Sequence, residues 1–282
     1  MSPGARLASL SGHGCLRLAR AEPTHNPHRW CLPVTEGIAT RGRFLFGGCG
    51  LGAAVAALEQ TTGRPLVWAT AQYLSFAMIG DVVDLDVTIS VEGHATTQAR
   101  LVAHVGEREI LTVNGALGSK DHPAAGQYVD PPEVPAAADC PARPAREEDE
   151  RSIMTRLDMR LAKGRQWDDL DGHPVTDGRS ALWVRLPDED GSPLAVSGGS
   201  LAILGDYVPF GISQSQGIWW PSNSLDNTIR IVSLADTEWI LVDVRVEGIA
   251  GGFGHGTVYL WSDSGVLLAT ASQSALLRSQ AL

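Results

Sequence analysis

The two halves of this 282-residue chain repeat each other, and this repeat limits the possible fold more than any other feature of the sequence. Residues 81–92 read DVVDLDVTISVE and residues 236–247 read DTEWILVDVRVE, so a shift of 155 positions (247 − 92) superimposes their alternating apolar residues. An apolar residue at every second position is typical of a β-strand with one buried face. Residues 110–117 (ILTVNGAL) resemble residues 268–276 (LATASQSAL) in a similar way. A repeat of this length predicts two copies of one supersecondary unit.

Each copy is predicted to hold one central helix and an antiparallel meander of strands. In the first copy, a helix is expected at the Gly- and Ala-rich residues 47–58, with strands at 66–77, 82–92, 96–105 and 109–117. In the second copy, a helix is expected near 194–208, with strands near 153–161, 180–186, 224–232, 238–247, 256–261 and 265–277. This order predicts an α+β protein built as a tandem double hotdog, in which each antiparallel sheet wraps around its helix. Because neither half can bury its exposed sheet edge alone, we expect the two sheets to join into one pseudo-dimeric sheet.

A segment rich in Pro and Ala separates the two copies. It ends in an acidic run at residues 147–150, and its few apolar residues show no period, which is typical of a linker. The predicted division is therefore an N-terminal extension at 1–29, a first hotdog unit at 30–117, the linker at 118–150 and a second hotdog unit at 151–282.

Charge and cysteine content argue against several kinds of partner. The net charge is −10 and Lys and Arg form no cluster, so we expect no nucleic-acid partner. The four cysteines are scattered without zinc spacing, and we expect no metal and no cofactor. No apolar stretch approaches the roughly 18 residues of a membrane span, and the first thirty residues lack the continuous apolar stretch of a signal peptide. The expected location is therefore cytoplasmic.

Four short motifs occur in a characteristic order along the chain. They are F-G-G at 46–48, L-G-D at 204–206, S-L-D-N-T-I at 224–229 and L-A-T-A-S-Q-S at 268–274. In order and spacing they resemble the acyl-CoA thioesterase II family, the bacterial double-hotdog enzymes, over roughly residues 30–278 apart from the linker. The resemblance implies hydrolysis of acyl-CoA thioesters to a free acid and CoA, a reaction of fatty acid metabolism. From the exposed sheet edges and helices we expect a homodimer of double hotdogs.

The same resemblance implies three catalytic side chains, all in the second hotdog unit: Asp206, Ser224 and Gln273. Asp206 would accept a proton from the attacking water, while Ser224 and Gln273 would hold that water by hydrogen bonds. Asp206 follows an apolar run that predicts partial burial. Taken without the resemblance, Ser224 fits a turn equally well, and Gln273 fits a solvent-facing position on a strand.

The repeat offers a check on how many sites to expect. It pairs Ser224 with Ala69 and Gln273 with Asn114, so the polar trio is complete only in the second half. The first-half helix has no obvious match for the catalytic carboxylate, although Glu59 lies near its end. One competent site is therefore expected in the chain.

The negative charge that develops on the thioester oxygen needs hydrogen-bond donors. We expect these at the N-terminus of the first-half helix, where the backbone N–H groups of Gly48, Cys49 and Gly50 point outward. The Cys49 side chain is interpreted as a small apolar neighbour rather than as a reactive thiol.

An aromatic group lies between the second-half helix and Ser224 in the sequence. Its members are Phe210, Trp219 and Trp220. Core packing and a wall of the acyl pocket explain such a group equally well.

Two departures from the family pattern keep other functions open. Asn227 stands where His is common after S-L-D, and Cys49 stands where His or Gln is frequent after F-G-G. A non-catalytic acyl-CoA-binding double hotdog is therefore one alternative. An enoyl-CoA hydratase-like enzyme is less favoured, because it needs a His a few residues after Asp206 and residues 207–211 contain none.

Overall fold

Each copy of the repeat contains helical segments and a run of antiparallel strands. The structure is a computed structural model and describes residues 21–144, 146, 150–174, 177–187 and 192–278. The first copy contains β1 (Glu22–Pro23), β2 (Arg29–Pro33), η3 (Glu36–Ile38), α2 (Gly47–Thr62), β3 (Leu66–Tyr73), β4 (Val82–Glu92), β5 (Thr96–Val105) and β6 (Arg108–Gly118). The rest contains η4 (Ala137–Asp139), η6 (Ile153–Arg156), β7 (Asp158–Lys163), η7 (Trp167–Asp169), β8 (Arg179–Arg185), α3 (Gly198–Leu204), α4 (Val208–Gln216), β9 (Ser222–Ile231), β10 (Ile240–Ala250), β11 (Phe253–Ser262) and β12 (Leu267–Leu277).

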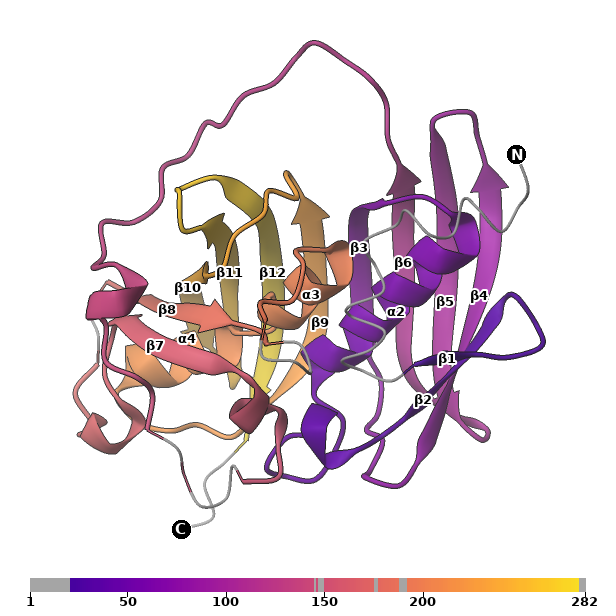
Figure 1. The fold of residues 1–282 in the computed structure, drawn as a ribbon. Helices are drawn as coiled ribbons and strands as arrows, with labels where there is room; N and C mark the ends of the chain where they lie inside the picture. The colour runs from indigo at the N-terminus through magenta and orange to yellow at the C-terminus, as the bar shows by residue number, and fades with distance from the viewer. Residues whose placement is uncertain (1–20, 145, 147–149, 175–176, 188–191, 279–282) are drawn as a thin grey trace.

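One sheet runs through both copies, and strands β3 and β9 join them at its centre (Figure 1). The order of its 12 strands is β1-β2-β4-β5-β6-β3-β9-β12-β11-β10-β8-β7. In the antiparallel pair of β3 and β9, Thr70 lies opposite Thr228, and their Oγ1 atoms are 2.8 Å apart. Each half thereby covers the inner sheet edge that the other half would expose.

The central strands repeat with a shift of 158 residues (225 − 67), rather than the 155 derived from the sequence, because the bulge at Val67 in β3 recurs at Leu225 in β9. The pairing of Thr70 with Thr228 is consistent with the same shift. Alternation has a period of two, so it does not distinguish shifts that differ by two residues, and bulges change the shift further.

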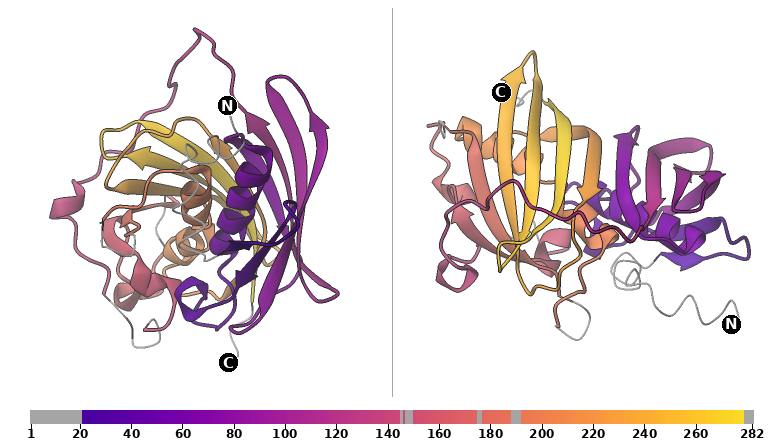
Figure 2. Two further views of the ribbon diagram at one scale, coloured as in Figure 1. Left: turned by 45° about the vertical axis from the view of Figure 1, so that its right-hand side comes forward. Right: turned by 90° about the horizontal axis from the view of Figure 1, so that it is seen from above.

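Helix α2 is surrounded by protein because its side chains are small. Every residue from Gly48 to Glu59 is buried, and most of them are Gly or Ala. Small side chains let the sheet curve closely around the helices (Figure 2). Although α2 is apolar, no helix in the described residues is long and apolar enough to cross a membrane.

The single helix predicted near 194–208 is wrong, because the chain forms two helices, α3 and α4. Helix α3 ends at Leu204, and α4 begins with Pro209 in its first turn. Proline lacks the N–H needed to continue α3 but suits the first turn of a new helix. Asp206 therefore lies at the break between the two helices. The strand predicted near 153–161 likewise starts later, as β7, after the short 3-10 helix η6.

The predicted linker packs against the outer face of the second-half sheet. The indole N–H of Trp183 donates to the carbonyl oxygen of Pro135 at 2.9 Å. The side-chain amide of Gln127 donates to the Gly265 carbonyl at 3.2 Å and accepts from the Leu267 N–H at 2.8 Å. These contacts fix a segment that has almost no regular secondary structure.

Parts of the predicted division lie outside the described residues. Residues 1–20 of the predicted extension are among them, as are residues 145 and 147–149, which include most of the acidic run. The described end of the extension forms β1, at one edge of the sheet. The boundaries of the four predicted segments remain predictions.

Candidate active site

Three side chains of the second half meet in a polar cluster: the buried Asp206 and Gln273 and the half-buried Ser224. The side-chain N–H group of Gln273 donates to Asp206 Oδ1, and also to Ser224 Oγ at 2.7 Å. The Ser224 hydroxyl donates to the same Asp206 oxygen at 3.2 Å. The side-chain oxygen of Gln273 accepts from the Val208 N–H at 3.3 Å, and this bond orients the amide. The fold thus brings together the three residues that the sequence singled out.

Irregular backbone positions two of these side chains. Asp206 lies where α3 stops, and Ser224 precedes the bulge at Leu225 in β9. Gln273 lies on β12 opposite Asn227 of β9, and both side chains are buried. The cluster is therefore held by three separate elements of the second half.

The first turn of α2 lies directly against this cluster. The N-cap residue Phe46 has no side-chain acceptor for the first-turn N–H groups, and the Gly48 N–H instead bonds to the Asp206 carboxylate. A Cβ atom at Gly47 would lie 2.7 Å from Asp206 Oδ2. At Gly48 it would lie 2.6 Å from the carbonyl oxygen of Ile203. Glycine is required at both positions because the two halves approach each other so closely.

The equivalent helix end in the second half is arranged differently. Helix α3 begins after Ser197, whose Oγ accepts from the Ser200 N–H at 3.1 Å in a capping box. Glu59 of the first half approaches this end, since its Oε1 would lie 2.9 Å from a Cβ at Gly198. Because Ser197 already caps α3, Glu59 accepts instead from the Leu66 N–H at 2.9 Å.

Burial decides the proton affinity of the carboxylate in the cluster. The Asp206 side chain is enclosed, and removal from water raises its pKa to about 6. Hydrogen bonds from Gln273, Gly48 and Ser224 lower the pKa by a smaller amount. A carboxyl with this pKa is ionised at neutral pH and still basic enough to take up a proton.

In the first half, apolar or small residues occupy the positions of Ser224 and Gln273. On the 158-residue shift, Leu66 is the counterpart of Ser224 and Gly115 is the counterpart of Gln273. The sequence repeat had predicted Ala69 and Asn114 at these positions. The polar trio is therefore complete in the second half alone, although the buried first-half carboxyl of Glu59 also has a raised pKa, of about 7.

Two of the three predicted oxyanion donors keep suitable positions, and one does not. Gly48 and Cys49 belong to the first turn of α2, beside Asp206. The Gly50 N–H donates to the Phe46 carbonyl at 3.0 Å and is the first bond within the helix. The expectation that Gly50 presents a free N–H is therefore wrong, because a donor this far into a helix already has a backbone acceptor.

Tyr73 and Asn227 also lie at the site, although neither was predicted to have a role there. The buried hydroxyl of Tyr73 has the buried side chain of Asn227 as its hydrogen-bonding neighbour. Burial, and then the nearby charge of Asp206, raise the pKa of Tyr73, so its hydroxyl stays protonated. A Cβ at Gly47 would lie 3.2 Å from the Tyr73 ring, which places this tyrosine at the same helix end. Alternation along β3 could have indicated that Tyr73 faces inward, whereas nothing in the sequence indicated its neighbours.

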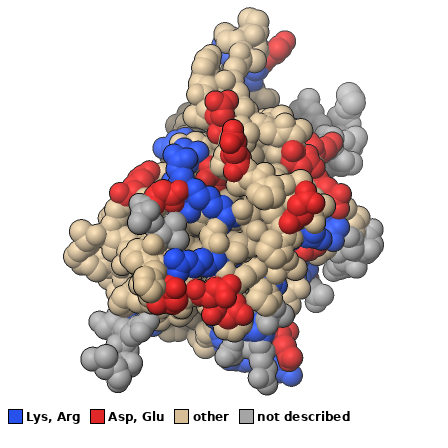
Figure 3. All heavy atoms as spheres, turned by 90° about the vertical axis from the view of Figure 1, so that its left-hand side faces the viewer, with Lys and Arg blue, Asp and Glu red and all other residues tan. Residues whose placement is uncertain are grey.

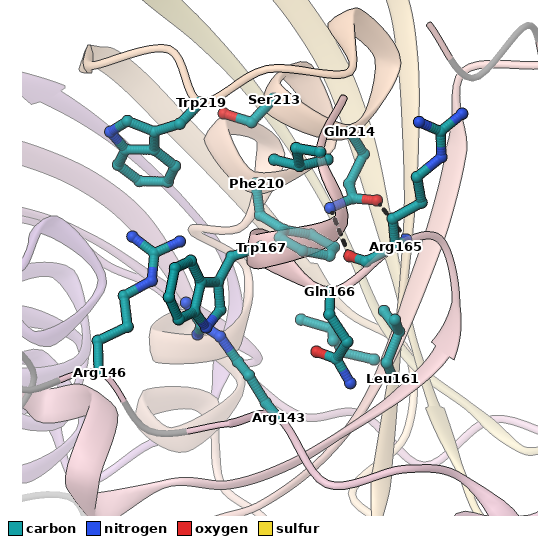
Figure 4. Close-up of a pocket in the computed structure, with 12 residues that line it drawn as sticks. Arg143, Arg146, Leu161, Arg165, Gln166, Trp167, Phe210, Ser213, Gln214 and Trp219 are labelled. Atoms are coloured by element: carbon teal, nitrogen blue, oxygen red, sulfur yellow. Dashed lines mark hydrogen bonds between the residues drawn. The ribbon is translucent and has the colours of Figure 1, made fainter. Parts of the chain in front are cut away.

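A hollow beside α4 contains two of the three predicted pocket aromatics (Figure 4). Phe210 and Trp219 line it, and Trp220 does not. The backbone N–H of Trp220 donates to Ser213 Oγ at 3.2 Å. The full lining is Arg143, Arg146, Leu161, Arg165, Gln166, Trp167, Leu170, Leu182, Phe210, Ser213, Gln214 and Trp219.

Comparisons with known proteins agree with this architecture. The family described as "Acyl-CoA thioesterase C-terminal domain" matches residues 137–277. A crystal structure from Novosphingobium aromaticivorans, described provisionally as a thioesterase, is 32% identical, with a TM-score of 0.80 over 92% of this chain and 98% of that one. A hot dog fold protein from Alicyclobacillus acidocaldarius has a TM-score of 0.81 at 19% identity, covering 95% and 99% of the two chains. The acyl-CoA thioesterase II TesB2 of Mycobacterium marinum has a TM-score of 0.72 at 18% identity, covering 95% and 99%. No curated protein matched the chain.

These matches define a thioester hydrolase with the double hotdog fold, which confirms the predicted fold and the predicted class of enzyme. Within that class, the chain belongs to the acyl-CoA thioesterase family.

The contact between the two halves at Gly47 can be tested by adding one methyl group. Gly47→Ala places a Cβ 2.7 Å from Asp206 Oδ2, so the carboxylate must move, and we expect kcat/KM to fall about 100-fold. Gly50→Ala is the matched control, because the nearest atom to its Cβ, Leu45 Cδ2, is 3.4 Å away. Thiol release from an acyl-CoA measures both variants. Equal activity of the two would show that the close approach at Gly47 is not needed for turnover.

Proposed function

We propose that the chain hydrolyses acyl-CoA thioesters with Asp206 as general base and with Ser224 and Gln273 as the groups that hold the attacking water. The observation that carries this proposal is the buried Asp206 carboxylate, which touches both partners and the first turn of α2. The family supplies the reaction and the acyl-CoA substrate, and the cluster supplies groups suited to it.

In the proposed reaction, a water held by Ser224 and Gln273 gives a proton to Asp206 while its oxygen bonds to the thioester carbonyl carbon. The carbonyl oxygen becomes negatively charged. When this intermediate collapses, the C–S bond breaks, and Asp206 returns the proton to the departing sulfur. The products are the free acid and CoA, and the carboxylate is regenerated.

The first turn of α2 is the proposed site of the developing oxyanion. The N–H groups of Gly48 and Cys49 and the positive end of the helix dipole favour negative charge there. Gly48 bonds to the Asp206 carboxylate in the resting enzyme. When Asp206 takes up the proton it loses its charge, and the Gly48 N–H becomes available to the oxyanion.

Tyr73 and Asn227 complete the polar lining of the proposed site. Their buried polar groups bond to each other, but this single contact leaves donors and acceptors of the Asn227 amide unused, and a buried polar atom without a partner is costly. We propose that polar atoms of the bound thioester satisfy them. Phe210 and Trp219 are proposed as a wall of the acyl pocket.

Replacing each of the two buried acids in turn should show which of them acts as the base. Asp206→Asn removes the proton acceptor, and we expect kcat to fall by about 100- to 10,000-fold. Glu59→Gln is the matched control, since it neutralises the other buried carboxyl at a place without the Ser and Gln partners, and its turnover should stay within about threefold. Thiol release from acyl-CoAs of several chain lengths measures both. Turnover that depends on Glu59 and not on Asp206 would refute the assignment of the base, and wild-type binding without turnover would indicate an acyl-CoA-binding protein.

The pKa of Asp206 predicts the pH dependence of activity. The base acts only when it is ionised, so kcat/KM should rise about tenfold per pH unit below pH 6 and level off above it. The profile is measured by thiol release between pH 4.5 and 8.5. A plateau that extends down to pH 4.5 would show that burial does not raise this pKa.

The same pKa predicts an opposite effect of pH on stability. The raised pKa means that the folded protein holds a proton on Asp206 between pH 3.8 and about 6, whereas the unfolded chain has released it. The stability of wild type relative to Asp206→Asn should therefore fall as pH rises through this window, by roughly 3 kcal/mol in total, and stay constant above it. Denaturant unfolding at pH 4, 5, 6 and 7 gives the difference in free energy of unfolding. A difference that grows with pH would mean that folding stabilises the ionised form.

A further inference from the structure

The hollow beside α4 combines an apolar floor with several guanidinium groups (Figure 4). Leu161, Leu182 and Phe210 are among its apolar residues. The guanidinium of Arg146 lies over the ring of Trp167 at 3.8 Å and faces that of Trp219 at 5.7 Å. This combination suits a ligand that is apolar along its length and carries a negative charge.

Arg143 is a cation of this hollow whose hydrogen bonds go to weak acceptors. Its Nη1 atom donates to the Sδ atoms of Met154 and Met159, at 3.4 Å and 3.5 Å. A thioether sulfur is a weak acceptor, and a guanidinium offers five donors. Among the described residues, no carboxylate lies within salt-bridge distance of Arg143.

Two other cations near the hollow are already neutralised. Arg165 pairs with Asp171, and Lys163 pairs with Asp177 at 2.6 Å. The side of the molecule that carries β7 shows the same pattern, with Lys and Arg interleaved with Asp and Glu (Figure 3). Arg143 therefore lacks, in the described part of the chain, the kind of acidic partner that Arg165 and Lys163 have.

Arg143 is also connected to the catalytic cluster. Tyr207 follows Asp206 in the chain, and its hydroxyl donates to Met159 Sδ at 3.5 Å, the same sulfur that Arg143 contacts. Phe210 lies in the first turn of α4, just beyond Asp206. Phe210 and Arg143 line the same hollow, so an acyl chain that enters it past Phe210 would come near Arg143.

We propose that this hollow receives the acyl group and that Arg143 binds a carboxylate at the end of that group, so that CoA monothioesters of dicarboxylic acids are the preferred substrates. The inference rests on the reaction proposed above for Asp206. A carboxylate would give the Arg143 guanidinium strong acceptors in place of two sulfur atoms.

The test compares two CoA esters of equal chain length, hexanedioyl-CoA and hexanoyl-CoA. Wild type should have a kcat/KM at least about tenfold higher for hexanedioyl-CoA, since a charge-assisted bond forms only with that ester. Arg143→Met keeps an apolar side chain of similar length. It should lower kcat/KM about 30-fold for hexanedioyl-CoA and less than about threefold for hexanoyl-CoA. Arg230→Met, at an exposed position on β9 outside the hollow, is the control and should change neither value.

Each other outcome overturns the proposal. Wild type that favours hexanoyl-CoA would show that the hollow does not select a carboxylate. Arg143→Met could lower kcat/KM equally for both CoA esters but not for the corresponding pantetheine thioesters. This result would show that Arg143 binds a phosphate of CoA. An equal loss that persists with the pantetheine thioesters would show that Arg143 acts on the thioester chemistry itself.

A binding measurement keeps the test independent of turnover and of the folding of Arg143→Met. Calorimetric titration of Asp206→Asn with both esters should give a Kd at least about tenfold lower for hexanedioyl-CoA. Equal or weaker binding of that ester overturns the proposal. If wild type hydrolyses neither ester, the proposed function fails, and this titration still decides whether the hollow recognises the carboxylate.

Discussion

The contact between the first turn of α2 and the Asp206 carboxylate joins the two halves of this enzyme at the point where the proposed chemistry takes place. Helix α2 has no side-chain cap of its own, so its first N–H groups need an acceptor from elsewhere. Asp206 provides it from the other half. This contact between Asp206 and the first turn of α2 requires glycine at 47 and 48, because any side chain there would separate the two halves. The junction of β3 with β9 holds the halves in the relative position that this contact needs.

The two buried acids, Asp206 and Glu59, are similar in burial but differ in the groups that they contact. Asp206 and Glu59 each lie beside the first turn of the helix in the opposite half, and burial raises the pKa of both. Asp206 meets an uncapped helix and two polar side chains, whereas Glu59 meets a helix capped by Ser197 and the apolar Leu66. The difference in partners, rather than in burial, marks Asp206 as the proposed base.

Much of the fold could be predicted from the sequence, because the alternation of apolar residues and the internal repeat can be recognised without the tertiary structure. The double hotdog fold and the central sheet were predicted correctly. The split of the second helix was not, since Pro209 begins a second helix just past the expected helix at 194–208. Gly50 was wrongly expected to be free, because the exact first residue of a helix is not visible in its composition. The convergence of Asp206 with Gln273 came from the family resemblance, and no residue pattern in β3 pointed to Tyr73 as their neighbour.

The fusion of two hotdog units in one chain changes what a single mutation does. In a symmetric dimer, each substitution occurs in both subunits. A residue that helps at one position and hinders at the equivalent position is therefore present at both. Here Leu66 and Gly115 occupy the first-half positions equivalent to Ser224 and Gln273, and the second half keeps its two polar residues. Equivalent positions of the two halves can therefore carry different residues within one chain. One half supplies a helix end without the polar pair, while the other half carries the polar pair.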